Sequence, residues 1–200
     1  MRTTKTGKLL NLARRRGFIR PRDVEKAGIP RNYLKRLVER GQLQKIDRGL
    51  YSADEIASSE HVSLVQISHK APKAVVCLLS ALRFHNIGTQ IPSEVWIAID
   101  TKARAPKIEH PAVRIVRFSG EALHFGMERH DVGGTTIKVY TPAKTVADCF
   151  KFRHKIGTDV ALEALRESYR QKKATMDDLW EAAKVCRVAN VMRPYMEFLV

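Results

Sequence analysis

Three residues near the N-terminus, Asn32, Lys35 and Arg36, carry side chains that can hydrogen-bond with the edges of DNA bases. Lys and Arg donate to the two major-groove acceptors of guanine, and Asn bonds to adenine through both ends of its amide. With residues 31–40 in a helix, a rotation of about 100° per residue places these side chains opposite an apolar stripe centred on Leu34. The pattern predicts a helix that buries its apolar face and presents its polar face to a DNA groove.

Positive charge is concentrated in the same part of the chain. The sequence has 36 Lys and Arg residues and 21 Asp and Glu residues, which gives a net charge of +15. Residues 1–52 hold 15 of the basic residues and 4 of the acidic ones, so this quarter of the chain alone carries +11. Such a surplus indicates a polyanionic partner, and the apolar residues interspersed at helical spacing indicate a folded segment.

Nine cations of this segment suit contacts with the DNA backbone, which position a protein on the duplex without specifying a sequence. Arg31 and Arg40 flank the predicted helix and suit either backbone or base contacts. The nine are Arg14, Arg15, Arg16, Arg20, Arg22, Arg31, Arg40, Lys45 and Arg48. We therefore expect double-stranded DNA as the partner of this segment.

Capping and turn residues define the helices that hold these side chains. Gly17, Gly28 and Gly41 end three predicted helices, because glycine is the usual residue after a helix C-terminus. Pro21 and Pro30 open the second and third, where a missing amide N–H costs least. Two short helices joined by a turn that contains glycine predict a helix-turn-helix.

A basic β-hairpin follows the third helix in the sequence. Alternating apolar residues lie on both sides of Asp47-Arg48-Gly49, and the hairpin has Lys45 and Arg48 on or near its tip. A helix, a helix-turn-helix and a basic hairpin in this order predict a winged helix-turn-helix DNA-binding domain over residues 1–55.

The remaining sequence predicts an α+β domain over residues 60–200 that ends in a helical tail. A polar bridge at 53–59 joins it to the first domain, so the fold class is α+β with two domains. The expected elements are helices at 61–70 and 74–85, strands at 95–99 and 113–118, a hairpin of 127–132 and 135–140 through Gly133-Gly134, and helices from 141, 158 and 175.

Three stretches of the chain carry the motifs of one family. They are GFIRPRDVEKAGIPRNYLKRLVERGQLQKIDRGLYS at 17–52, VVCLLSALRFHNIGTQIPSEVWIAID at 75–100 and VYTPAKTVADCFKFRHKIGTDVALEALRE at 139–167. In these the chain resembles AbiEi-type antitoxins of abortive-infection, type IV toxin-antitoxin systems, and related winged-helix transcriptional regulators. The resemblance implies a DNA-binding domain that represses its own operon and a second domain that opposes a nucleotidyltransferase-like toxin, although the family also has stand-alone members.

Enzymatic alternatives have weak support in the sequence. Asp100 and Lys102 resemble half of a metal-dependent nuclease site, for which Glu94 is a poor second carboxylate. The seven histidines have no zinc-ligand spacing, and no phosphate-binding loop or nucleophile elbow is present. We therefore expect no enzyme, metal or cofactor, with a nuclease as the alternative.

One acidic residue inside the family motif has two interpretations. Asp148 lies four residues after Lys144 and close to Lys151 and Arg153, so an ion pair on a helix face is the simpler one. Its place in the motif leaves a contact with a toxin or with a second copy of the chain as the other.

The cysteines and the lengths of the apolar runs indicate the cellular compartment in which the protein is expected. Cys77, Cys149 and Cys186 are odd in number and widely spaced, which favours small buried side chains in a reducing cytoplasm. The longest apolar run, 74–82, is far shorter than the roughly 20 residues of a membrane span, so neither a span nor a secretory signal is expected.

Because one helix contacts few base pairs, we expect a homodimer on an inverted repeat of a promoter.

Overall fold

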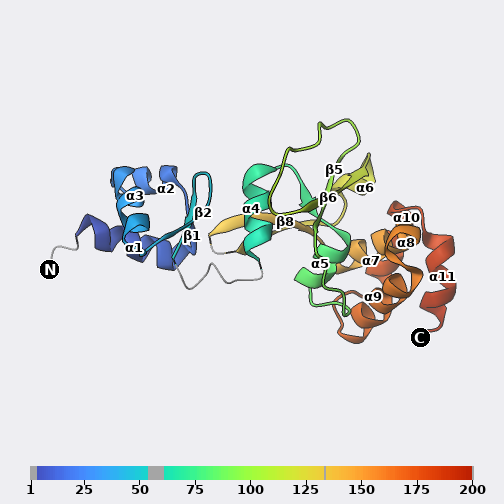
Figure 1. Ribbon diagram of the computed structural model, residues 1–200. Coiled ribbons are helices and arrows are strands. Elements are labelled where there is room, and N and C mark those ends of the chain that lie inside the picture. The colour runs from blue at the N-terminus through green and yellow to red at the C-terminus, as the bar shows by residue number, and fades with distance from the viewer. Residues whose placement is uncertain (1–3, 54–60, 133, 200) are drawn as a thin grey trace. The chain divides into compact units, whose positions relative to one another are not determined.

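The computed structural model describes residues 4–53, 61–132 and 134–199, and the chain divides into two compact units (Figure 1). The N-terminal unit consists of residues 1–69 together with 130–137, and the C-terminal unit consists of 70–129 and 138–200. The polar bridge expected at 53–59 falls almost entirely outside the described residues, as does Gly133. The described chain is mixed α+β with two sheets, in agreement with the expected class.

Three helices build the first part of the N-terminal unit: α1 (Lys5–Arg16), α2 (Pro21–Lys26) and α3 (Asn32–Glu39). The Thr4 hydroxyl accepts a hydrogen bond from the Gly7 N–H at 3.2 Å and so caps the N-terminus of α1. The helices are held together by an apolar cluster to which each contributes buried side chains, among them Leu9, Ala13, Val24, Leu34 and Leu37.

A tight turn joins α2 to α3. Gly28 has a φ of +71°, a left-handed conformation that is strained for any residue with a side chain. The N–H of the next residue, Ile29, donates to the Val24 carbonyl at 3.1 Å, and the Ile29 side chain is buried in the cluster. The turn therefore fixes the direction in which α3 leaves α2.

A three-stranded antiparallel sheet completes this core, formed by β1 (Phe18–Ile19), β2 (Gln44–Asp47) and β3 (Leu50–Ser52) in the order β1-β3-β2. The buried Ser52 hydroxyl donates to the Gly17 carbonyl at 2.8 Å and ties β3 to the end of α1. The β2–β3 pair is the hairpin that the sequence predicts.

Helix α4 (Val62–Lys70) and the tip of a second hairpin also belong to the N-terminal unit. The Ser68 hydroxyl donates to the Thr136 carbonyl at 2.9 Å, and a Cβ on Gly134 would lie only 2.9 Å from the Arg16 carbonyl oxygen. The close approach at Gly134 requires a residue without a side chain, because such Cβ contacts are sterically forbidden.

The C-terminal unit is built on a five-stranded sheet of order β6-β5-β4-β8-β7. Its strands are β4 (Val75–Val76), β5 (Val95–Asp100), β6 (Val113–Phe118), β7 (Met127–Val132) and β8 (Thr135–Tyr140). Strands β5 and β6 are parallel, β4 is antiparallel to β5, and β4 is parallel to β8.

The prediction of a helix over residues 74–85 is wrong for the first residues of this range. Val75 and Val76 form β4 in the middle of the sheet, and helix α5 begins only at Leu78 and ends at Phe84. A continuous apolar run suits a buried strand and a buried helix equally, and here the two β-branched residues pair with Ala98 and Ile97 of β5.

Helix α7 (Pro142–Lys151) forms the centre of the helical part of this unit, where all eight residues from 143 to 150 are buried. It packs against α5, α9 and α10, and these helices lie close together in Figure 1. The remaining helices are α6 (Glu121–His124), α8 (Arg153–Ile156), α9 (Thr158–Arg170), α10 (Met176–Val185) and α11 (Ala189–Glu197).

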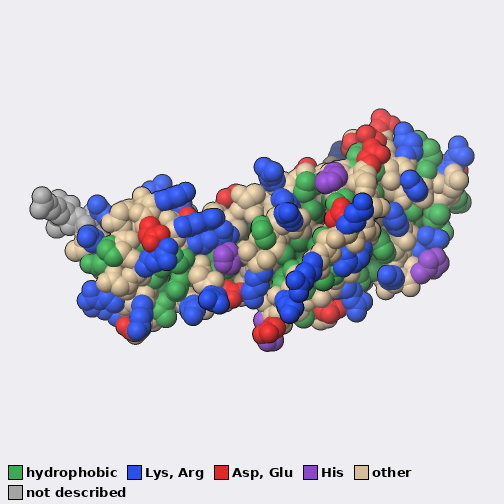
Figure 2. Space-filling view, turned by 90° about the horizontal axis from the view of Figure 1, so that it is seen from above, with side chains coloured by type: hydrophobic (Ala, Val, Ile, Leu, Met, Phe, Trp, Pro, Cys, Tyr) green, Lys and Arg blue, Asp and Glu red, His purple; other side chains and the backbone are tan. Residues whose placement is uncertain are grey.

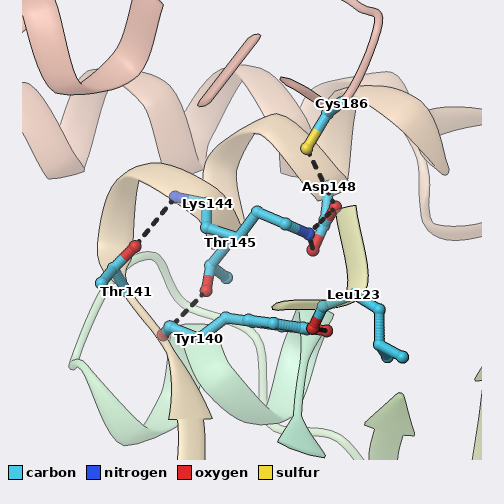
Figure 3. Close-up of polar contacts among 7 residues, drawn as sticks. All are labelled: Leu123, Tyr140, Thr141, Lys144, Thr145, Asp148 and Cys186. Atoms are coloured by element: carbon cyan, nitrogen blue, oxygen red, sulfur yellow. Dashed lines mark hydrogen bonds and ion pairs between the residues drawn. The ribbon is translucent and has the colours of Figure 1, made fainter. Parts of the chain in front are cut away.

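An ion pair lies inside this core (Figure 3). Lys144 and Asp148 are both completely buried, and the Lys144 Nζ lies 2.6 and 2.5 Å from the two carboxylate oxygens of Asp148. The rings of Phe118 and Tyr140 lie 4.5 and 4.2 Å from the same Nζ, and the Cys186 thiol donates to Asp148 Oδ1 at 3.4 Å. Both charges are therefore partnered within the core.

None of the helices in the described part of the chain has the length and apolar character that crossing a membrane requires.

Candidate nucleic-acid interface

The exposed face of α3 carries the three residues expected to contact bases. Asn32, Lys35 and Arg36 are all exposed, whereas Leu34 and Leu37 of the same helix are 2% and 1% exposed. This separation places the apolar side chains in the core and leaves the polar face in contact with solvent. The helix therefore presents three hydrogen-bonding side chains together on one surface.

Two local contacts restrict the cations of this face. The Arg36 guanidinium lies 5.7 Å from the centroid of the Tyr33 ring, and the Lys35 Nζ lies 3.8 Å from Glu39 Oε1. Both are exposed contacts of about 1 kcal/mol or less, so a stronger anionic partner can displace them. The contact with Tyr33 thus partly orders the Arg36 side chain.

Two of the nine cations expected to contact the backbone are paired with carboxylates of the protein, and a third, Arg20, is partly buried. Arg16 lies 3.3 Å from Asp23 Oδ1, and the Arg31 guanidinium donates to Glu25 Oε2 at 3.0 Å. The hydrogen bond to Glu25 raises the pKa of Arg31, while partial burial lowers the pKa of Arg20. These pairs join α1 to α2 and α2 to the start of α3, so these cations have a structural role as well.

The other six cations are exposed and have no carboxylate within 4.0 Å among the described residues. They come from four different elements of the unit: the last turn of α1, helix α2, the end of α3 and the hairpin. They are Arg14, Arg15, Arg22, Arg40, Lys45 and Arg48. Figure 2 shows the resulting surface, in which Lys and Arg side chains lie over much of the visible face of the N-terminal unit.

The hairpin is supported by a helix that sequence reasoning assigned to the second domain. Arg48 lies in the turn between β2 and β3, and Lys45 lies within β2. Gln66 of α4 donates through Nε2 to the Ile46 carbonyl at 3.0 Å, and His69 Nε2 lies 3.4 Å from the Arg48 carbonyl oxygen. Helix α4 therefore holds the turn end of the hairpin in place, and only the amphipathic pattern at 61–70 could have indicated the element.

The carboxylates considered for a nuclease do not converge. Glu94 precedes β5 and pairs with Arg114 at 3.0 Å, whereas Asp100 ends the same strand, so about 20 Å of extended chain separates them. Asp100 Oδ1 accepts the Lys102 N–H at 2.7 Å, which is a turn that orders the following loop. Within residues 4–53, 61–132 and 134–199, no group of three His, Cys, Asp or Glu side chains could hold a metal ion.

Asp148 and the cysteines are core residues. Asp148 pairs with Lys144 as the simpler interpretation predicts, but inside the core, where it is inaccessible to a toxin or a second copy. Burial raises the pKa of Asp148 against the opposing effect of Lys144, and burial raises the pKa of the Cys186 thiol to about 12. Cys77 and Cys149 are also free and buried, with pKa values raised by the same cause.

Comparison with known proteins bears on both units. Residues 8–53 match the family model described as "Transcriptional regulator, AbiEi antitoxin", which confirms the predicted resemblance for this segment. A solved structure titled "Crystal structure of RV2827C protein from Mycobacterium tuberculosis" is similar with a TM-score of 0.62 and 13% sequence identity, over 96% of this chain and 77% of that chain. At this identity the likeness shows a shared fold. No curated protein matches the sequence.

Proposed function

We propose that the chain is a DNA-binding transcriptional regulator whose N-terminal unit acts as a winged helix-turn-helix domain. The exposed polar face of α3 within a segment of net charge +11 carries this proposal. The order of three helices followed by a β-hairpin is that of a winged helix, and the family match over residues 8–53 supports the same role.

In this mechanism α3 enters the major groove. Asn32, Lys35 and Arg36 bond to base edges, each good bidentate pair contributing roughly 1–3 kcal/mol of discrimination between bases. The six exposed cations, unpaired with carboxylates in the described part of the chain, bind phosphates, and Arg48 in the hairpin turn reaches the backbone beside the groove. The protein acts by binding and performs no covalent chemistry.

The resemblance to AbiEi-type antitoxins supports a further proposal about the genes that the protein regulates and about its protein partners. Two copies of the chain bind an inverted repeat in the promoter of their own operon and repress it in the cytoplasm. The C-terminal unit opposes a nucleotidyltransferase-like toxin encoded beside it. Co-purification of the adjacent gene product with this chain tests the toxin partner, and a stand-alone regulator would yield DNA binding without it.

Substitutions that separate base from backbone contacts test the DNA-binding proposal. The double variant Lys35→Ala/Arg36→Ala removes preference among duplex sequences in a competitive selection from random duplexes, whereas Arg48→Gln weakens binding to all duplexes about equally. Lys184→Gln, which changes an exposed cation on α10, is the matched control and leaves affinity unchanged. Equal affinity of all four proteins for duplex DNA would contradict the proposal.

A further inference from the structure

The C-terminal unit contains a cavity that DNA binding does not use. It has a volume of about 530 Å³, within the range of sites that hold small organic ligands. It opens where the loop after β5 meets the start of β4 and the strands β7 and β8. Most of its lining is apolar, including Ala71, Val75, Ile99, Leu123 and Met127.

The charged side chains that line this cavity are mainly cations. Lys73, Arg104 and Lys138 contribute three positive charges, and Asp100 contributes the one carboxylate among the lining residues. The Asp100 carboxylate is partly satisfied, because its Oδ1 accepts the Lys102 N–H at 2.7 Å. An anion inside the cavity would therefore meet a net positive surrounding.

The walls of the cavity are fixed by hydrogen bonds. Arg117 of β6 directs its Nη1 at the carbonyl oxygens of Asp100, Thr101 and Ala103 at 3.2, 2.9 and 2.9 Å, which holds the loop after β5. Lys138 donates through Nζ to the Pro72 carbonyl at 3.0 Å. An ammonium group has three donors, so Lys138 is held at the cavity and keeps two donors for a ligand.

We propose that this cavity binds a small organic anion with an apolar body and one carboxylate or sulfonate group. The apolar lining removes the body of the ligand from water, and Arg104 and Lys138 donate hydrogen bonds to the anionic group. A neutral ligand of the same shape would gain only the apolar part of this energy. The site is independent of the α3 face, so its failure leaves the DNA-binding proposal intact.

Anilinonaphthalene sulfonate is a suitable probe, because it combines an aromatic body with one sulfonate and fluoresces in apolar surroundings. We expect saturable binding of one probe per chain to the full-length protein. Arg104→Gln and Lys138→Gln each weaken the affinity by at least about tenfold, as expected for the loss of one hydrogen bond between charged groups. Binding of neutral phenylnaphthylamine changes by less than about twofold in the same variants.

Two further variants control for surface binding and for the location of the site. Lys107→Gln removes an exposed cation from the same loop but outside the cavity lining, and it leaves the probe affinity unchanged. Ala103→Trp fills the cavity from an exposed loop position and abolishes binding of both probes. No saturable binding, an equal effect of Lys107→Gln and Arg104→Gln, or full binding by Ala103→Trp would overturn the proposal.

Discussion

Removal of either partner from the buried pair of Lys144 and Asp148 is expected to lower the stability of the fold strongly. Unit charges 2.6 Å apart attract each other by about 6 kcal/mol at an effective dielectric constant of about 20, and this attraction offsets a desolvation cost of several kcal/mol for each ion. Because the two terms nearly cancel, the pair contributes little net stability. Removal of one partner leaves an uncompensated charge in the core.

We therefore expect Lys144→Met to lower the free energy of unfolding by about 3–5 kcal/mol, which corresponds to a Tm lower by roughly 6–20 °C. The double variant Lys144→Met/Asp148→Leu recovers most of this loss, because neither charge is then buried. Lys151→Met makes the same change at an exposed position of α7 and shifts stability by less than about 0.5 kcal/mol. Chemical denaturation of the four proteins measures these differences.

The pH dependence separates charge burial from lost packing. Burial already raises the pKa of Asp148, and without the Lys144 ammonium it rises further. The folded state then holds its proton more tightly than the unfolded state, so stability is present at low pH and is lost as pH rises through the raised pKa. The loss of unfolding free energy caused by Lys144→Met is thus smaller at about pH 5 than at about pH 8. A loss of unfolding free energy below about 1 kcal/mol in Lys144→Met, or a loss that does not change with pH, would refute this reasoning.

Three other predictions follow from named contacts. Ser80→Ala leaves the Trp96 N–H without its acceptor at 2.9 Å in the core and costs about 1–3 kcal/mol of unfolding free energy in denaturant titration. The three buried cysteines do not react with a thiol-specific reagent at about pH 8 in the native protein, and all react after denaturation; rapid native labelling would contradict their burial. Arg31→Gln, whose partner Glu25 already neutralises the cation, weakens duplex binding less than Arg22→Gln does in a shift assay, and the reverse order would show that the Glu25 pair opens on DNA.

The helices of the N-terminal unit could be predicted because their local signals agree. Gly28 in the turn and Pro21 at the first position of α2 define the ends of the elements, and the spacing of Leu34 and Leu37 defines the buried face of α3. The exposure of Asn32 follows from this spacing alone. Local patterns were therefore sufficient for the surface that we propose contacts DNA.

Features that depend on distant parts of the chain could not be predicted. Val75 and Val76 are a strand because β5 and β8 lie on either side of them, which the apolar run does not reveal. The support of the hairpin by Gln66 joins residues twenty positions apart in sequence. The burial of Asp148 depends on the helices packed around α7, so its spacing from Lys144 indicated the pair but not its location in the core.

The salt dependence of duplex affinity tests the central claim most directly. Six exposed cations of the N-terminal unit, which have no carboxylate partner among the residues that the structure describes, each neutralise one phosphate and predict a slope of about −5 in a plot of log affinity against log salt concentration. Affinity then falls about a thousandfold between roughly 50 and 200 mM salt. A slope near zero would show that these cations do not bind the DNA backbone and would contradict the account.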